Sequence, residues 1–112
     1  MKIAIPLAGG QLARHFGHCE EFVLFDVDGE NRTIKGSQTL ATPPHQPGLL
    51  PQWLKELGAE VLITGGMGRR AQHLLASSGI EAIVGVSAND PRAIVKDYLE
   101  GCLESGENLC DH

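Results

Sequence analysis

From residue 49 onward the chain alternates between helical and strand-like apolar patterns, and this alternation restricts its fold more than any other feature. Segment 49–58 predicts a helix, because its apolar residues recur on one helical face: Leu50, Trp53, Leu54 and Leu57. Apolar runs at 59–66 and 80–86 predict buried strands. Segments 68–79 and 89–104 predict two further helices. Such βα units place their strands in parallel, with right-handed crossovers.

The first forty residues predict three strands, at 2–7, 22–28 and 32–41. The second strand would present two sets of side chains to opposite faces: Phe22, Leu24 and Asp26 on one, and Val23, Phe25 and Val27 on the other. The turn DGEN at 28–31 is typical of a hairpin. The glycine inside the third strand is typical of an edge or bulged strand. We therefore expect an α/β fold with a mixed five-stranded sheet, three antiparallel strands followed by βαβα units, and three helices.

One domain over residues 1–104 and a polar tail over residues 105–112 are expected from the length and from the lack of periodicity at the end. The order of elements is that of ribonuclease H-like folds, in which nucleases hold metal ions with acidic residues at strand ends. The first strand here, KIAIPL, contains no acid, and Glu60 stands at the wrong end of its strand. Nuclease chemistry is therefore disfavoured. The formal net charge of -5 argues against a nucleic-acid partner.

The chain shows neither a signal-peptide pattern nor an apolar run of the ~18 residues that cross a bilayer. We expect cytoplasmic residence and no membrane partner. The three cysteines should then stay reduced, and an odd count fits poorly with a disulfide framework. Their thiols are therefore available to bind metal.

Histidine and cysteine gather in three segments that predict loops or tail: HFGHCEEF at 15–22, TPPHQPG at 42–48, and the closing CDH. Imidazole and thiolate are ligands that suit zinc, copper or iron. The candidate metal ligands are His15, His18, Cys19, His45, Cys110 and His112. A closed zinc site needs four ligands. Two loop cysteines cannot form an all-cysteine iron–sulfur site in one chain. A cluster would need histidine ligands, thiols supplied with the cofactor, or a second subunit in a homodimer.

A glycine-rich turn, TGGMGRRA at 64–71, joins a predicted strand to a predicted helix. Its backbone N–H groups, the helix dipole and Arg69 would favour an anion. The dinucleotide interpretation fails, because the turn does not follow the first strand and the next strand does not end in an acid. The plainer alternative is that the glycines only allow close packing of strand and helix.

Three side chains receive other interpretations. Cys19 could be a nucleophile activated by a neighbouring histidine, but no third group that would orient the pair is identifiable. Cys102 continues the apolar stripe of the last predicted helix, so we expect it to be buried. His73 is expected to be exposed and is given no role. No catalytic residue is assigned.

Three segments, HFGHCEEF, PHQPGLLPQWLKELGAEVLITGGMGRRA and CDH, together resemble the dinitrogenase iron–molybdenum cofactor biosynthesis family. This family includes NifX-like proteins and the C-terminal domain of NifB-like proteins. The resemblance implies a ribonuclease H-like fold without nuclease activity. It also implies a non-catalytic protein that binds or carries an iron–sulfur or iron–molybdenum cluster, or a precursor, and exchanges it with a donor or acceptor protein.

The resemblance also implies site residues: His15, Phe16, Gly17, His45, Gly65, Gly66, Gly68, Cys110 and His112. His18 and Cys19 match no position of the family motif and would form an extra ligand pair. Two alternatives remain open. One is a zinc or other transition-metal site, and the other is a regulatory module that binds an anionic small molecule at residues 64–70.

Overall fold

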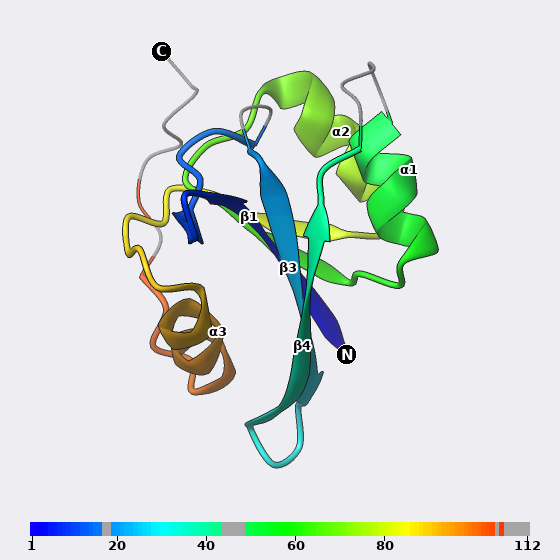
Figure 1. Ribbon diagram of the computed structural model, residues 1–112. Helices are drawn as coiled ribbons and strands as arrows, with labels where there is room; N and C mark the ends of the chain where they lie inside the picture. Colours follow the sequence, from blue (N-terminus) through cyan, green and yellow to red (C-terminus); the bar gives the residue numbers. More distant parts are fainter. Residues whose placement is uncertain (17–18, 44–48, 105, 107–112) are drawn as a thin grey trace.

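The computed structural model describes residues 1–16, 19–43, 49–104 and 106 of the chain. Nine elements follow one another along it (Figure 1): β1 (Lys2–Ala8), β2 (Gln11–Leu12), β3 (Glu21–Asp28), β4 (Thr33–Ala41), α1 (Leu49–Glu56), β5 (Val61–Ile63), α2 (Arg69–Ser77), β6 (Glu81–Ile83) and α3 (Pro91–Leu99). None of the helices in these ranges is long and apolar enough to span a bilayer.

The strands form one mixed sheet in the order β4-β3-β1-β5-β6. β1 pairs antiparallel with β3, and β3 with β4, whereas β1 pairs parallel with β5, and β5 with β6. The mixed sheet and the three helices are as predicted, but the predicted number of five strands is wrong. The sixth, β2, pairs with the end of β1 through Leu7 and Leu12. Two residues are too few to produce a visible period, so this strand could not be recognised in the glycine-rich segment.

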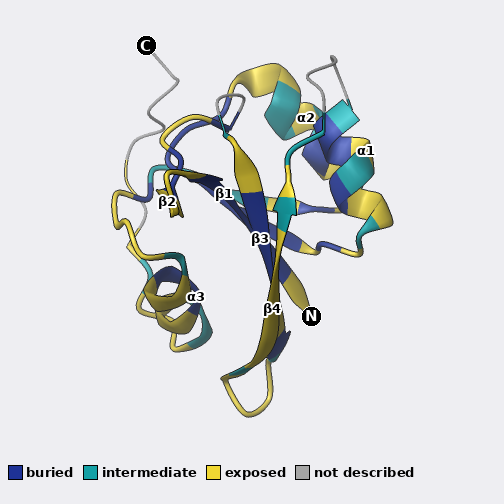
Figure 2. Ribbon diagram, in the orientation of Figure 1, coloured by how far each residue is buried: buried dark blue, intermediate teal, exposed yellow. Residues whose placement is uncertain are grey.

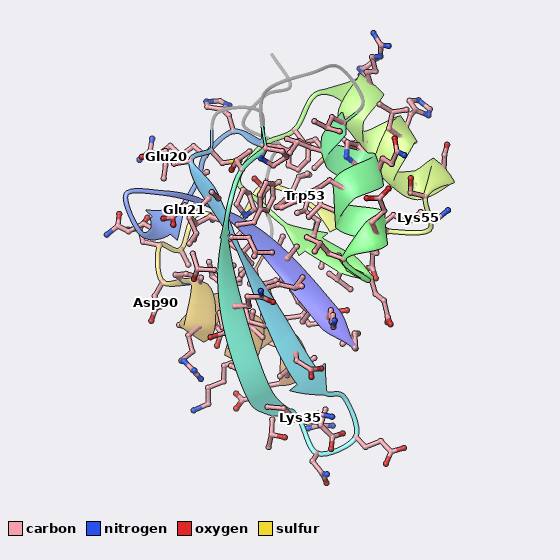
Figure 3. The ribbon with its side chains drawn as sticks, turned by 45° about the vertical axis from the view of Figure 1, so that its right-hand side comes forward. Glu20, Glu21, Lys35, Trp53, Lys55 and Asp90 are labelled. Carbon is pink, nitrogen blue, oxygen red and sulfur yellow. The ribbon has the colours of Figure 1, made fainter. Side chains whose placement is uncertain are left out.

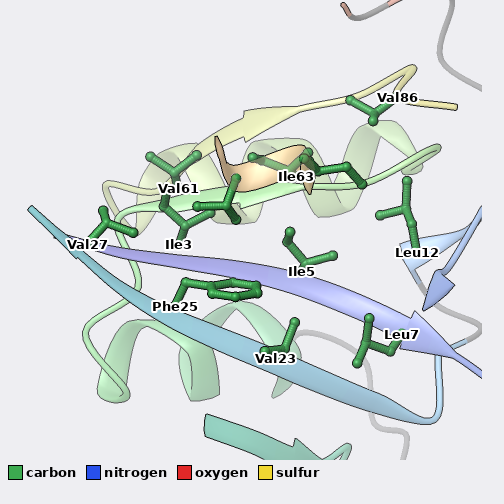
Figure 4. Packing of buried hydrophobic residues seen from close by; sticks show 12 residues of the cluster. Ile3, Ile5, Leu7, Leu12, Val23, Phe25, Val27, Val61, Ile63 and Val86 are labelled. Atoms are coloured by element: carbon green, nitrogen blue, oxygen red, sulfur yellow. The ribbon is translucent and has the colours of Figure 1, made fainter. Parts of the chain in front are cut away.

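The two faces of the sheet are covered unequally, with α1 and α2 on one face and α3 on the other (Figures 1 and 2). Val23, Phe25 and Val27 of β3 lie in the cluster beneath α3, together with Ile94 and Val95 of that helix (Figure 4). The alternate residues of β3 lie in the cluster beneath α1 and α2, which includes Phe22, Leu24, Leu54 and Leu75. The predicted division of the β3 side chains between the two faces is confirmed.

β4 lies at the edge of the sheet, as predicted, and most of its residues are exposed. The register between β3 and β4 shifts between Asp26 and Val27, as a bulge produces. In the hairpin turn, Asp28 Oδ1 accepts hydrogen bonds from the N–H groups of Glu30 at 3.0 Å and Asn31 at 3.2 Å. Hydrogen bonds from Asn31 to the Asp28 carboxylate lower the pKa of that carboxyl group.

α3 begins within two residues of the start of the predicted segment 89–104, and it ends earlier than predicted. Asp90 is its N-cap and accepts a 3.2 Å hydrogen bond from the Arg92 N–H, with Pro91 in the first turn. Gly101 has a φ of 75°, which ends the helical path before residue 104. The prediction that Cys102 is buried is therefore wrong: this thiol is exposed, because the residue lies beyond the apolar stripe of the helix.

Candidate functional site

The sheet topology brings the candidate loops to one end of the molecule. β1, β5 and β6 are parallel, so their carboxyl ends lie together. β3 begins at this end and β4 finishes there, because each runs antiparallel to its neighbour. The segments that follow β4, β5 and β6 therefore start from the same end (Figure 1). β2 lies at this end as well, because it pairs with the last two residues of β1. Ligands of open α/β sheets bind outside the carboxyl ends of the strands.

The glycine turn, residues 64–71, is hydrogen-bonded directly to the HF segment, by which we mean His15 and Phe16. The Phe16 N–H donates a 2.8 Å hydrogen bond to the Gly66 carbonyl. The Thr64 hydroxyl, which is fully buried, lies 3.3 Å from the Ala13 carbonyl oxygen and 3.5 Å from that of Gly66. A hydroxyl has one proton to donate, so it alternates between these acceptors or is shared by them. Segments separated by about fifty positions are thus held as one unit.

Two more glycines extend this contact. The Gly85 N–H donates a 2.9 Å hydrogen bond to the Gly65 carbonyl, and the Gly106 N–H donates a 2.8 Å bond to the Gly85 carbonyl. We call residues 13–16, 64–66, 85 and 106 the backbone junction. It unites the HF segment and the glycine turn with the start of the C-terminal tail.

Cys19 follows the HF segment in the connection between β2 and β3. It lies next to the beginning of the proline segment, residues 42–48. Its Sγ is 3.6 Å from the Thr42 hydroxyl oxygen, and the Thr42 N–H donates a 3.1 Å hydrogen bond to the Glu20 carbonyl. The side chain is half-buried against the cluster beneath α1 and α2. Burial raises the pKa of the Cys19 thiol, and the hydrogen bond with Thr42 lowers it by less. A thiol held in its neutral form is a poor nucleophile, which disfavours the catalytic interpretation.

The metal-free protein should therefore react unevenly with iodoacetamide near pH 8. Alkylation needs an accessible thiolate; burial raises the pKa of the Cys19 thiol and shields its Sγ from the reagent, whereas the Cys102 side chain is exposed. We expect Cys19 to be modified several-fold more slowly than Cys102, as measured by timed quenching and peptide mass spectrometry. In denaturant the two rates should converge. Equal rates in the native protein would contradict the burial of Cys19.

α2 begins without the devices that normally close a helix N-terminus. Its N-cap is Gly68, no side chain caps it, and its first turn contains no acidic residue. Arg69 and Arg70 are exposed there, although the helix dipole favours anions at this end. The N–H groups of a first turn have no intrahelical acceptors, so together with two arginines they can bind an anion. α3, with Asp90 as its cap, shows the usual arrangement.

A shallow depression of about 300 Å³ continues along α2 from this end, lined by Arg69, Gln72, His73 and Ala76. Gln72 Nε2 donates a 3.1 Å hydrogen bond to the Met67 carbonyl, which fastens the helix to the glycine turn. His73 is exposed, as predicted.

Aromatic side chains connect the junction to the core. Phe16 packs edge to face with Phe22 at 6.0 Å between ring centroids, and Phe22 packs in the same manner with Trp53 at 5.4 Å. Trp53 reaches from α1 toward the sheet, near the end where Glu20 and Glu21 lie (Figure 3). Phe16 is buried in this contact, while its neighbour His15 is exposed.

The structure thus places only some of the predicted site residues. Phe16, Gly65 and Gly66 meet in the junction, and Gly68 and Arg69 begin α2. Five predicted residues lie outside the described ranges: Gly17, His18, His45, Cys110 and His112. Within those ranges, no three histidine, cysteine or acidic side chains come close enough to hold a metal ion. The predicted ligand set stays a prediction.

The residues of the junction that the sequence analysis did not single out include Thr64, Gly85 and Gly106. Thr64 ends an apolar strand, and a hydroxyl in a buried run must find an acceptor. Gly85 interrupts a predicted strand, which is a signal for close backbone approach. Both signals were available. Nothing in the sequence distinguishes Gly106.

The chain is similar to proteins of known sequence and structure over nearly its whole length. It is 30% identical to the uncharacterized protein MJ0580 of Methanocaldococcus jannaschii, an alignment that covers 96% of this chain and 92% of the relative. It superposes on the crystal structure of PH0822 with a TM-score of 0.87 at 28% identity, over the full length of both chains. It superposes on the apo form of the orange protein of Desulfovibrio gigas with a TM-score of 0.74 at 26% identity, over 96% and 93% of the two chains.

Residues 1–101 match the family described as dinitrogenase iron-molybdenum cofactor. The match includes the HF segment, the glycine turn and all nine elements of the fold. The resemblance drawn from the three sequence motifs is therefore confirmed, and this chain belongs to the dinitrogenase iron–molybdenum cofactor family.

Proposed function

We propose that this chain binds and carries an iron–sulfur or iron–molybdenum type cluster, or its precursor, at the end of the sheet where the backbone junction lies. The observation that carries the proposal is the junction itself. Its hydrogen bonds bring the HF segment, the glycine turn and the start of the tail together from distant parts of the chain. Family membership supports a role related to this cofactor, and the junction is the place where we propose that the cargo binds.

The chemistry of this region suits such a cargo. Clusters of this kind are anionic, and the uncapped start of α2 offers N–H groups with Arg69 and Arg70 beside them. We propose His15, His18, Cys19, His45, Cys110 and His112 as the residues that could bond to the metal. In the described part of this set, His15 is an exposed residue of the junction and Cys19 adjoins Thr42.

This donor set is incomplete for an all-cysteine cluster, and that suits reversible loading. A donor or acceptor protein, or a second copy of the chain in a homodimer, would complete the coordination during transfer. We accordingly propose a carrier without catalytic activity that works in the cytoplasm. The ribonuclease H-like assignment also remains a proposal, supported by the order of the five longer strands.

A second candidate function rests on one observation, the uncapped start of α2 with two exposed arginines. In that case the chain would be a regulatory module that binds an anionic small molecule. A simple zinc site is a further outcome that metal analysis would detect.

Anaerobic purification and reconstitution test the leading proposal. The apoprotein is incubated with iron, sulfide and, in a parallel sample, molybdate under reducing conditions, and is then desalted. We expect metal and sulfide to remain with the protein, with visible absorption from charge-transfer bands. Apoprotein incubated with zinc alone is the comparison for the simpler metal site.

Colourless protein that retains neither iron nor sulfide would contradict cluster binding. Stoichiometric zinc after aerobic purification would favour the zinc site. A rise in melting temperature with inorganic phosphate, unchanged in His15→Ala and Cys110→Ser variants, would favour the anion-binding module.

A further inference from the structure

Thr64 has the one polar side chain that is fully buried among the residues that the structure describes. It directly follows β5, whose last two residues, Leu62 and Ile63, are also fully buried. Valine would have the same shape without a polar atom, and a hydroxyl in a dry core destabilises the fold unless it is hydrogen-bonded. The hydrogen bonds of this hydroxyl, and not its packing, therefore distinguish threonine from valine at residue 64.

The main chain of Thr64 is fixed by the segment that contains β6. Its N–H donates a 2.9 Å hydrogen bond to the Ile83 carbonyl, and its carbonyl accepts a 3.4 Å bond from the Val86 N–H. The side chain bonds instead to the segment that follows β2, through the Ala13 carbonyl at 3.3 Å. The hydroxyl thus connects an early part of the chain to a residue that is already held in place by a later part.

His15 lies between two hydrogen bonds to the glycine turn. Before it, the Ala13 carbonyl accepts the bond from the Thr64 hydroxyl. After it, the Phe16 N–H donates a 2.8 Å bond to the Gly66 carbonyl. Ala13 and Phe16 are buried, whereas His15 is exposed. The main chain is therefore attached to the glycine turn on both sides of this histidine.

We propose that Thr64 is a positioning residue, whose hydroxyl fixes the main chain around His15 and so holds this histidine at a constant place beside the glycine turn. The hydroxyl also lies 3.5 Å from the Gly66 carbonyl oxygen, so it is close to both attachments. The attachment rests on these hydrogen bonds alone, and its consequence for a cluster rests on the proposed function. A ligand that is already in place loses less conformational freedom when it binds, so removal of the hydroxyl should weaken metal binding through His15.

Thr64→Val tests the attachment, and two other substitutions separate the hydrogen bond from packing. Thr64→Ser keeps the hydroxyl and loses a methyl group, while Ile63→Val removes a methylene group from the neighbouring buried residue. In the metal-free protein we expect the Phe16 amide to exchange with solvent up to about tenfold faster in Thr64→Val, since a net hydrogen bond is worth about that factor. NMR measures this rate relative to the amide of Ile5, a buried residue of β1, which corrects for changes in global stability. Thr64→Ser and Ile63→Val should stay close to the unmodified protein.

A His15→Ala background tests whether Thr64 acts through this histidine. After reconstitution with iron and sulfide, a chelator should extract iron about two- to threefold more readily from Thr64→Val, the lower end of what one net hydrogen bond contributes. His15→Ala should have a larger effect by itself. Adding Thr64→Val to His15→Ala should then cause no further loss, because the two residues act as a unit. A general structural defect would instead lower iron retention in both backgrounds.

The attachment and the proposed function can fail separately. Unchanged Phe16 exchange in Thr64→Val overturns the attachment, and equal acceleration in Thr64→Ser and Ile63→Val overturns the role of the hydroxyl. Faster exchange with unchanged iron retention overturns the positioning role, as does an effect of Thr64→Val that persists without His15. If the unmodified protein retains no cluster, the proposed function and the positioning role fall together, while the attachment is still decided by the exchange rates.

Discussion

Replacing Phe22 with alanine is expected to lower the free energy of unfolding by about 3–5 kcal/mol, the range for a truncated aromatic residue in a packed core. Phe22 is 1% exposed and contacts two other rings, Phe16 and Trp53. Each edge-to-face pair adds about 0.5–1.5 kcal/mol of stability to the contribution from the buried apolar area. Urea titration followed by circular dichroism measures the loss.

Phe25→Ala is the matched control for this substitution. Phe25 belongs to the same strand and is 3% exposed, but it lies on the opposite face, beneath α3. Both variants should lose similar stability. Only Phe22→Ala should also speed amide exchange at Phe16, whose N–H is bonded to Gly66. Equal acceleration of Phe16 amide exchange in both variants would contradict a stabilising role of the aromatic contacts in the junction.

Small domains are stable by only about 5–15 kcal/mol, so Phe22→Ala could leave a substantial unfolded population. Phe22→Leu keeps most of the volume and should lose about 1–2 kcal/mol, within the usual range for point substitutions. In that variant the exchange of Phe16 can be compared in protein that is fully folded. A loss below about 0.5 kcal/mol would contradict tight packing at this position.

The second large effect is expected at the proposed ligands. A variant with both His15→Ala and Cys110→Ser should lose cluster retention by at least about tenfold, since even partners of metal ligands contribute 10–100-fold to affinity. Each single substitution should have an intermediate effect. The measurement is iron and sulfide content per chain after anaerobic reconstitution and desalting.

The chain offers a control of matched composition, His73→Ala with Cys102→Ser. The side chains of His73 and Cys102 are exposed, and they lie on α2 and beyond the end of α3. This control removes the same two residue types, so non-specific binding of iron by thiols and imidazoles changes equally. Equal loss of iron and sulfide in the two double variants would remove our ligand assignment without deciding whether a cluster binds elsewhere.

The elements with strong local signals could be predicted closely. β3 alternates apolar side chains between two covered faces, and this pattern can be read directly from eight consecutive residues. Asp90 and Pro91 mark the start of α3 in the sequence, because helix capping depends on residues that are neighbours in the sequence. The edge position of β4 followed from its glycine and its polar residues. In each case the deciding interaction is local.

The wrong predictions have other causes. β2 exists because Gln11 and Leu12 find partners on β1, and nothing within a two-residue strand reveals that pairing. Cys102 was expected to be buried because helical spacing was extended past Gly101, whose positive φ ends the helix. The strands predicted at 59–66 and 80–86 are shorter in the structure, although residues 61–67 are all buried. Burial and strand pairing are different properties, and an apolar run reports only burial.

The candidate site was predictable as a set of motifs and not as a geometry. His15, Phe16 and the glycine turn could each be identified as unusual loop residues. That they meet depends on hydrogen bonds between main-chain groups, and such groups are the same in every residue. The residues of the HF segment and the glycine turn can therefore be identified in the sequence. Their proximity depends on the parallel pairing of β1 with β5.

The backbone junction also has a consequence for the order of events during synthesis. Its parts are contributed by residues 13–16, 64–66, 85 and 106, so they leave the ribosome at widely separated times. The early antiparallel strands can pair while translation continues, because their contacts are local. The junction closes only when residue 106 has emerged from the exit tunnel. The hydrogen bonds of the junction therefore form later than the pairing of β1 with β3 and of β3 with β4.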